Sequence, residues 1–163
     1  KKANNTIKFS FDSEIPPIQT LRLKVETDCR EHFSVMGWVK KDFKVESSWF
    51  SGSCFLTTYH LEELLGTKMR ALYQRKKGRD LYDLYKALTT EKVSAGNIIK
   101  CYKKYMSFST KTPPAKKQFL LNVDAKIKDE WFLGDIAALL IPNEKYDQNE
   151  AYELVKTELI EKL

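Results

Sequence analysis

The segment from Glu63 to Leu88 constrains the fold most, because two amphipathic helical patterns meet in it at a basic joint that contains a glycine. In the first pattern, leucine and methionine recur at spacings of three and four residues, which places them on one face of a helix. Gly78 interrupts this pattern, and a second apolar stripe follows it. The sequence therefore predicts two helices that meet at a corner. Their apolar residues are Leu61, Leu64, Leu65, Met69 and Leu72, then Leu81, Leu84, Tyr85 and Leu88.

Lys68 lies within the first stripe, one turn from Leu64 and Leu72. A buried ammonium is costly unless an anion receives it, so the side chain either turns outward at the border of the stripe or meets an acid. Asp80 and Asp83 lie one turn apart in the second helix and converge with Lys68 near the corner. An aspartate in the first turn of a helix also suits an N-cap or a favourable contact with the helix dipole. Spacing alone leaves both interpretations open.

The residues before Glu63 follow the pattern of β-strands. Apolar and polar residues alternate from residue 7 to 11 and again from 20 to 28, and each stretch is a predicted strand with one buried face. Residues 29–52 are less regular and fit a hairpin or an excursion over a sheet. Residues 55–59 form the last predicted strand. The aromatic residues of this region are expected in the core.

After Leu88 the sequence predicts only helices. The fifth helix is expected around Trp131 to Leu140, and the last runs from Gln148 to Leu163 with Asp147 as a possible N-cap. Strands first and helices after indicate an α+β fold, with a few antiparallel or mixed strands on the N-terminal side and a C-terminal helical bundle. We expect one domain over residues 1–59 and a helical domain over residues 60–163.

Composition narrows the classes of function. A net charge of +6 suits a polyanionic partner such as nucleic acid or nucleotide phosphates, and it also suits a solvated lysine-rich surface. No apolar run approaches the roughly 20 residues that span a bilayer, so we expect no membrane association. The three cysteines are widely spaced and the two histidines are isolated, which indicates neither a disulfide framework nor a zinc site. A reducing cytoplasm fits best.

The corner around Lys68 resembles the signature of the AbiEii/AbiGii family of toxin nucleotidyltransferases. The resemblance covers most of the chain and begins partway into the family's pattern. It implies that residues 1–59 are the end of a nucleotidyltransferase-like α/β part and that the chain is the C-terminal portion of the enzyme. The residues that carry it read Glu63-Leu64-Leu65, Thr67-Lys68, Arg70-Ala71-Leu72, Arg75, Lys77-Gly78-Arg79-Asp80 and Asp83-Leu84.

The same resemblance implies Mg²⁺-dependent transfer of a nucleotide from an NTP to an acceptor such as tRNA or another RNA. The enzyme would be the toxin of a toxin–antitoxin or abortive-infection pair, with a cognate antitoxin. Lys68 would contact the triphosphate, and Asp80 would orient a basic group or help to position metal or acceptor. The other expected roles are phosphate binding by Lys24, Arg75 and Arg79, support by Asp83, and metal binding by Glu26 or alternatively Asp28.

Two motifs of the family are missing from the sequence. The family's metal carboxylates come mainly from an Asp-x-Asp motif that follows a Gly-Ser motif. Here the only Gly-Ser pair is Gly52-Ser53, and no Asp-x-Asp occurs. We therefore expect the chain to be inactive alone. It is either a fragment of a complete enzyme, a relative that serves as an RNA- or protein-binding module, or a chain whose acids come from a separate partner.

Overall fold

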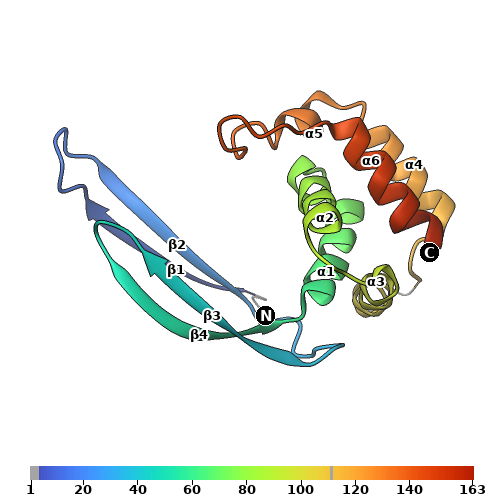
Figure 1. The fold of residues 1–163 in the computed structure, drawn as a ribbon, viewed down its shortest axis with the longest axis horizontal. Coiled ribbons are helices and arrows are strands. Elements are labelled where there is room, and N and C mark those ends of the chain that lie inside the picture. The colour runs from blue at the N-terminus through green and yellow to red at the C-terminus, as the bar shows by residue number, and fades with distance from the viewer. Residues whose placement is uncertain (1–3, 111) are drawn as a thin grey trace. The chain divides into compact units, whose positions relative to one another are not determined.

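The computed structural model describes residues 4–110 and 112–163, in which strands precede helices (Figure 1). This arrangement confirms the predicted α+β fold. The chain forms two compact units, one up to Phe33 and the other from Ser34 to Leu163. In the described residues, no helix is both long enough and apolar enough to cross a membrane. The elements are β1 (Asn4–Asp12), β2 (Thr20–Asp28), β3 (Trp38–Glu46), β4 (Ser51–Tyr59), α1 (Leu61–Gln74), α2 (Gly78–Thr90), α3 (Ala95–Ser109), α4 (Lys116–Lys126), α5 (Glu130–Gly134), α6 (Gln148–Glu158) and the 3-10 helix η1 (Ile160–Lys162).

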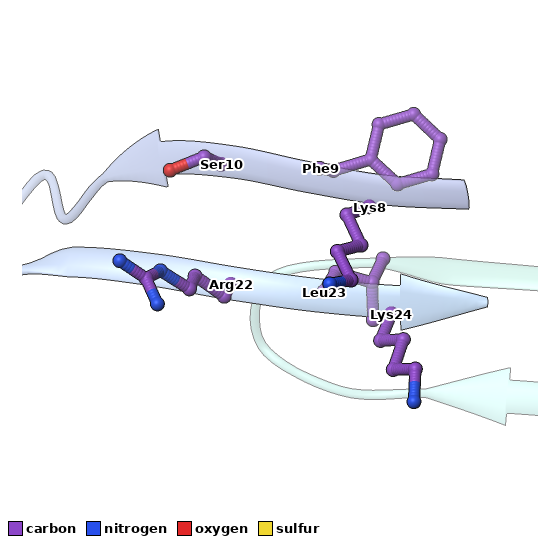
Figure 2. Close-up of a pocket in the computed structure, with 6 residues that line it drawn as sticks. All are labelled: Lys8, Phe9, Ser10, Arg22, Leu23 and Lys24. Carbon is purple, nitrogen blue, oxygen red and sulfur yellow. The ribbon is translucent and has the colours of Figure 1, made fainter. Parts of the chain in front are cut away.

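The first unit contains the antiparallel β1–β2 hairpin, in which Lys8 lies opposite Lys24 and Phe9 opposite Leu23. Because opposite residues share a face, one side of the hairpin is apolar and the other is polar. Lys8, Arg22 and Lys24 belong to the polar side (Figure 2). The predicted alternation is confirmed, but the expected burial of one face is not found. The apolar side chains are 43–57% exposed, and they are Ile7, Phe9, Phe11, Leu21, Leu23 and Val25.

The irregular region before α1 forms a second antiparallel hairpin, β3–β4, in which Trp38 lies opposite Tyr59. Trp49 and Phe50 lie in the turn between its strands and are 82% and 64% exposed. Phe55, Trp38 and Phe43 on the strands are 76%, 56% and 50% exposed. The expectation that the aromatic residues here are core residues was therefore wrong for all five. A two-stranded hairpin has no covering layer of its own.

The helices of the second unit share one core. α1 packs on α2 and α3, and α2 packs on α6. Gly66 lies where α1 and α3 approach most closely, because a Cβ there would come within 2.6 Å of the Cys101 Cβ and 2.9 Å of the Tyr102 backbone nitrogen. The predicted stripes of the first two helices supply much of the interior. Among the described residues, the hydrophobic side chains at 0% exposure are Met69, Leu72, Leu81, Leu84, Ile98, Cys101, Phe119, Val123, Phe132, Ala151, Val155, Leu159 and Ile160.

The fifth helix differs from its prediction. It ends at Gly134, and the residues that follow form turns instead of a helix reaching Leu140. Phe132 and Ile136 are buried, whereas Trp131 is 85% exposed. An apolar pattern alone cannot distinguish a helix from successive turns that bury the same two side chains. The last helix does begin after Asp147, whose carboxylate accepts the backbone N–H groups of Asn149 and Glu150 as an N-cap.

Glu63 is fully buried near the start of α1 and accepts four hydrogen bonds. The donors are the backbone N–H groups of Val35 (2.7 Å) and Met36 (2.9 Å) and the hydroxyls of Ser34 (2.8 Å) and Tyr105 (2.8 Å). Burial raises the pKa of this carboxyl, but the hydrogen bonds outweigh burial and leave the pKa below its usual value. The charged carboxylate therefore joins the segment before β3 to α1 and α3.

Lys126, the last residue of α4, is a buried cation whose ammonium lies at the C-terminus of α1. Its Nζ donates to the carbonyl oxygens of Leu72 (2.5 Å) and Tyr73 (2.7 Å), which have no partners within the helix. A cation at this end also interacts favourably with the helix dipole. Burial nevertheless lowers the pKa of Lys126 to about 8, so folding favours its neutral form.

Replacing Glu63 by Gln should lower the free energy of unfolding by about 2 kcal/mol at neutral pH, because the amide nitrogen cannot accept the hydrogen bonds that the second oxygen accepts. Urea titrations followed by circular dichroism measure this loss. A lowered pKa means that the contribution of Glu63 is complete above the usual pKa of 4.5 and disappears in more acidic solution. The difference in free energy of unfolding between the wild type and Glu63→Gln should therefore become smaller below pH 4.5. Glu62→Gln is the matched control, and an equal loss in both variants would contradict the assignment.

Lys126 predicts a stability change in alkaline solution. Between pH 8 and pH 10.5 the unfolded chain binds this proton and the folded chain does not, so the contribution of Lys126 to stability rises with pH. Between pH 7 and pH 10, the free energy of unfolding of the wild type should rise by about 2 kcal/mol relative to that of Lys126→Met. The comparison cancels tyrosine ionisation, which is common to both proteins. Lys128→Met, at an exposed neighbouring position, should show no such change. A constant difference between wild type and Lys126→Met would refute the lowered pKa.

Candidate functional site

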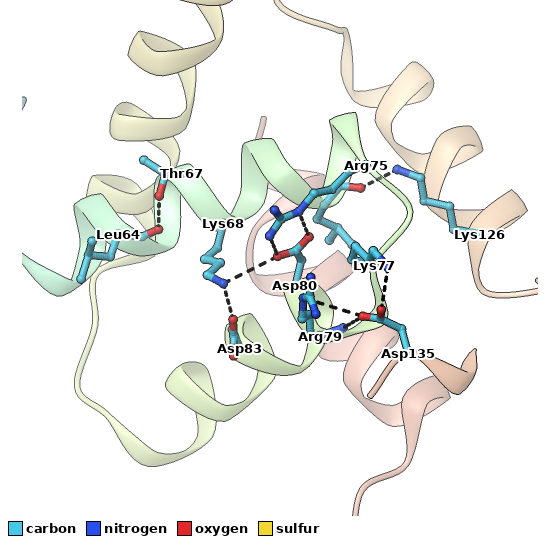
Figure 3. A network of polar contacts seen from close by, with 11 residues as sticks. Leu64, Thr67, Lys68, Arg75, Lys77, Arg79, Asp80, Asp83, Lys126 and Asp135 are labelled. Carbon is cyan, nitrogen blue, oxygen red and sulfur yellow. Dashed lines mark hydrogen bonds and ion pairs between the residues drawn. The ribbon is translucent and has the colours of Figure 1, made fainter. Parts of the chain in front are cut away.

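Asp80 is the centre of the corner between α1 and α2. It is the third residue of α2, and its side chain is fully buried. Arg75, in the connection between the helices, donates from Nε to Oδ2 at 2.7 Å and from Nη2 to Oδ1 at 2.6 Å (Figure 3). This bidentate contact neutralises a carboxylate that would otherwise be costly to bury. Asp80 is therefore not an N-cap, since α2 has no side-chain hydrogen bond at its N-cap residue, Lys77.

Lys68 approaches the same corner from α1. Its Nζ lies 2.6 Å from Asp83 Oδ2 and 3.7 Å from Asp80 Oδ1, and its side chain is 37% exposed (Figure 3). The two interpretations of Lys68 both describe part of this geometry. The side chain lies at the border of the apolar stripe, and its ammonium also meets the two acids. Since Asp83 is half-exposed too, an anion from solution can reach the ammonium and compete with that carboxylate.

The rest of the basic connection is paired with acids of a later segment. Lys76 lies 2.5 Å from Asp129, and Lys77 lies 3.0 Å from Asp135. Asp135 also accepts the backbone N–H of Arg79 at 3.4 Å, while the Arg79 guanidinium makes only a long contact of 3.9 Å with it. Of these cations, Arg79 is the one whose head group is least committed. Because Arg75 is held by Asp80, Lys68 and Arg79 are the remaining candidate phosphate contacts of the corner.

Gly78 holds the connection close to α5. A Cβ at this position would lie 2.2 Å from the carbonyl oxygen of Phe132, so only glycine fits the observed backbone. Gly78 is also the first residue of α2. The sequence pattern marked it as the end of a helical stripe, and the structure assigns it to the start of the next helix, at a close contact between segments.

Lys24 and Glu26 form a separate pair on β2. Their side chains meet at 2.7 Å and are equally exposed, at 52%. They belong to the first compact unit, whereas Lys68, Arg75, Asp80 and Asp83 belong to the second. The structure thus brings four of the seven predicted site residues together around one carboxylate, with Arg79 beside them and with Lys24 and Glu26 paired to each other.

The carboxylates in the described part of the chain do not fit a magnesium site by themselves. Over residues 4–110 and 112–163, no three His, Cys, Asp or Glu side chains cluster closely enough to hold a metal ion. Asp80 is occupied by Arg75, and Glu26 is occupied by Lys24. Mg²⁺ needs several oxygen ligands that are free to face it.

Asp129 and Asp135 are site residues that the sequence analysis missed. A hydrogen bond from Lys76 lowers the pKa of Asp129. Burial raises the pKa of Asp135, but its contacts with Lys77 and Arg79 outweigh burial and lower it. The run of cations at the connection was the one available signal, since some of its members pair with acids. Nothing in the spacing identifies which acids these are.

Comparison with known proteins identifies the family of the chain. The searches of curated proteins and of solved structures gave no significant match. The family profile described as "Nucleotidyl transferase AbiEii toxin, Type IV TA system" matches residues 1–154, which is nearly the whole chain. The match spans both hairpins and the corner between α1 and α2 that contains Lys68, Arg75 and Asp80. The chain therefore belongs to the AbiEii family of nucleotidyltransferase toxins of type IV toxin–antitoxin systems.

Proposed function

We propose that this chain is the C-terminal part of a Mg²⁺-dependent nucleotidyltransferase that transfers a nucleotide from an NTP to an RNA acceptor, tRNA in particular. The family implies an NTP substrate and a cognate antitoxin. The observation that carries the proposal is the half-exposed ammonium of Lys68, which is held at the corner by Asp83 and by the buried Asp80. The proposed setting is the cytoplasm, where NTPs and tRNA occur together.

The chemistry assigns a role to each residue of the corner. The oxygen of an acceptor hydroxyl attacks the α-phosphorus and gives up its proton to water, and pyrophosphate leaves with the electrons of the broken P–O bond. Lys68 stabilises negative charge on the phosphate oxygens, as positioned cations do in phosphoryl transfer. The triphosphate takes the place of Asp83 at the ammonium, while Asp80 stays fixed by Arg75 and keeps Lys68 aimed at the phosphates. Arg79 is the second phosphate contact.

Asp80 is therefore a positioning residue in this scheme, and so is Arg75. The bidentate contact with Arg75 compensates for the burial of the carboxylate. A charged Asp80 keeps an anion beside Lys68 even after Asp83 has been displaced. The carboxylates that hold Mg²⁺ are proposed to come from an Asp-x-Asp element outside this sequence, because no cluster of carboxylates in the described residues fits the ion.

The polar side of the β1–β2 hairpin supports an RNA acceptor. Lys8 lies directly opposite Lys24, and Arg22 is diagonal to Lys8 on the same side of the hairpin (Figure 2). Like charges in opposite positions destabilise a hairpin unless an anion lies between them. Lys24 is paired with Glu26, while no acid in the described residues forms an ion pair with Lys8 or Arg22. Phosphates of a nucleic-acid backbone would neutralise this row.

A second candidate function is a protein-binding module without catalysis. The observation that favours it is the apolar side of the same hairpin, on which Phe9 and Leu23 are 49% and 54% exposed. A hairpin of two strands is only marginally stable without a covering layer. The activity assay below separates the two candidates, since a binding module transfers no nucleotide in any form.

The activity prediction concerns Lys68 and Asp80. When the complete protein is incubated with labelled NTP, Mg²⁺ and tRNA, Lys68→Ala and Asp80→Asn should each reduce labelling about 100-fold or more, because each removes part of the charge arrangement around the phosphates. Lys76→Ala is the matched control, since Lys76 lies in the same connection and pairs with Asp129. It should retain near wild-type activity.

Circular dichroism of each variant separates lost function from lost folding. Full activity of both Lys68→Ala and Asp80→Asn would overturn the site assignment. A folded wild-type protein that labels no acceptor would overturn the enzymatic proposal and favour the binding module.

A further inference from the structure

A groove of about 360 Å³ lies beside Lys68, between α1 and α2. Lys68 and Asp83 form part of its wall, so the groove begins at the ammonium that is proposed to meet the triphosphate. Figure 3 shows Leu64 on the same helix, one turn before Lys68. The remaining lining residues are Leu61, Leu65, Tyr82, Lys86, Ala87, Thr90 and Glu91.

One side of the groove is apolar although solvent reaches it. Leu61 and Leu64 are 38% and 39% exposed, while Leu65 is buried behind them and Ala87 faces them from α2 at 8% exposure. Leucines of the predicted α1 stripe are thus left partly uncovered next to a charged pair. A ligand that suits this combination has an apolar face and an anionic end, as a nucleoside polyphosphate does.

The opposite rim is polar and is held in place. Lys86 Nζ lies 2.6 Å from Glu144 Oε1, and the Tyr82 hydroxyl donates to the same oxygen at 3.2 Å. The hydrogen bond with Glu144 raises the pKa of Lys86, so this side chain stays charged. The Tyr82 ring meets the Tyr146 ring edge-on, with centroids 5.1 Å apart. Both rim residues are therefore fixed before any ligand arrives, which reduces the entropy lost on binding.

We propose that this groove binds the nucleoside of the NTP, with the base or ribose against Leu61 and Leu64 and the phosphates directed toward Lys68. The proposal rests on the proposed function, since it takes Lys68 to be the phosphate contact. It adds a subsite to that function: the leucines of α1 hold the part of the substrate that has no charge, and the polar rim at Lys86 and Thr90 faces the hydroxyls or the edge of the base.

The test separates the nucleoside from the phosphates. Binding of a fluorescent ATP analogue is measured by polarisation. Inorganic tripolyphosphate, which has no nucleoside, is the second ligand. The double variant Leu61→Ala/Leu64→Ala should bind the analogue about 10-fold more weakly, because it loses two apolar contacts. Tripolyphosphate, assayed directly by calorimetry, should bind this variant as it binds the wild type. Lys68→Ala should lose affinity for both ligands.

Leu121→Ala is the matched control, because Leu121 is an exposed leucine outside the groove and should change neither affinity. Unchanged affinity of the double variant for the analogue, together with loss in Lys68→Ala, would overturn the nucleoside subsite and leave the proposed function intact. Equal loss of both ligands in the double variant would also overturn the subsite. Unchanged binding of both ligands to Lys68→Ala would overturn the subsite and the proposed function together.

Discussion

The buried carboxylate of Asp80 is the constraint on which the corner depends. Burial of this carboxylate is tolerated because Arg75 donates hydrogen bonds to both of its oxygens and Lys68 Nζ lies 3.7 Å from Oδ1. This contact fixes the connection, because it joins Arg75 at the end of α1 to Asp80 in the first turn of α2. Gly78 permits the close approach of α5 that brings Asp129 and Asp135 to the remaining lysines. One polar interaction thus orders the segment that carries the candidate chemistry.

The same interaction links structure to function in the proposed scheme. A phosphate-binding cation must be charged, accessible and aimed in one direction. Lys68 meets all three requirements because its ammonium contacts two acids of which only Asp83 is exposed. Ligand phosphates can displace the exposed partner and leave the buried one in place. The groove beside Lys68 adds an apolar surface to this site, because its leucines line the same groove as the ammonium.

Much of this architecture could be predicted from periodicity. The spacing of Leu65, Met69 and Leu72 identified α1 and its buried face, and alternation identified both strands of the first hairpin. The functional interpretation of Lys68 and Asp80 came from a family resemblance, because spacing alone fitted a cap equally well. The contacts of Glu63, Lys126 and Asp135 could not be predicted, since each joins segments that are distant in sequence. Hydrophobic pattern carries no information about which polar groups meet. The fifth helix was predicted too long for a related reason, because turns can bury the same residues as a helix.

The central claim is that Lys68 exchanges a carboxylate for a phosphate while Asp80 stays with Arg75. A crystal structure of the protein with a non-hydrolysable NTP tests it most directly. We expect Lys68 Nζ to have left Asp83 and to contact a phosphate oxygen, with the Arg75–Asp80 hydrogen bonds unchanged. A bound triphosphate that lies away from Lys68, or Lys68 still 2.6 Å from Asp83 in the complex, would contradict the account.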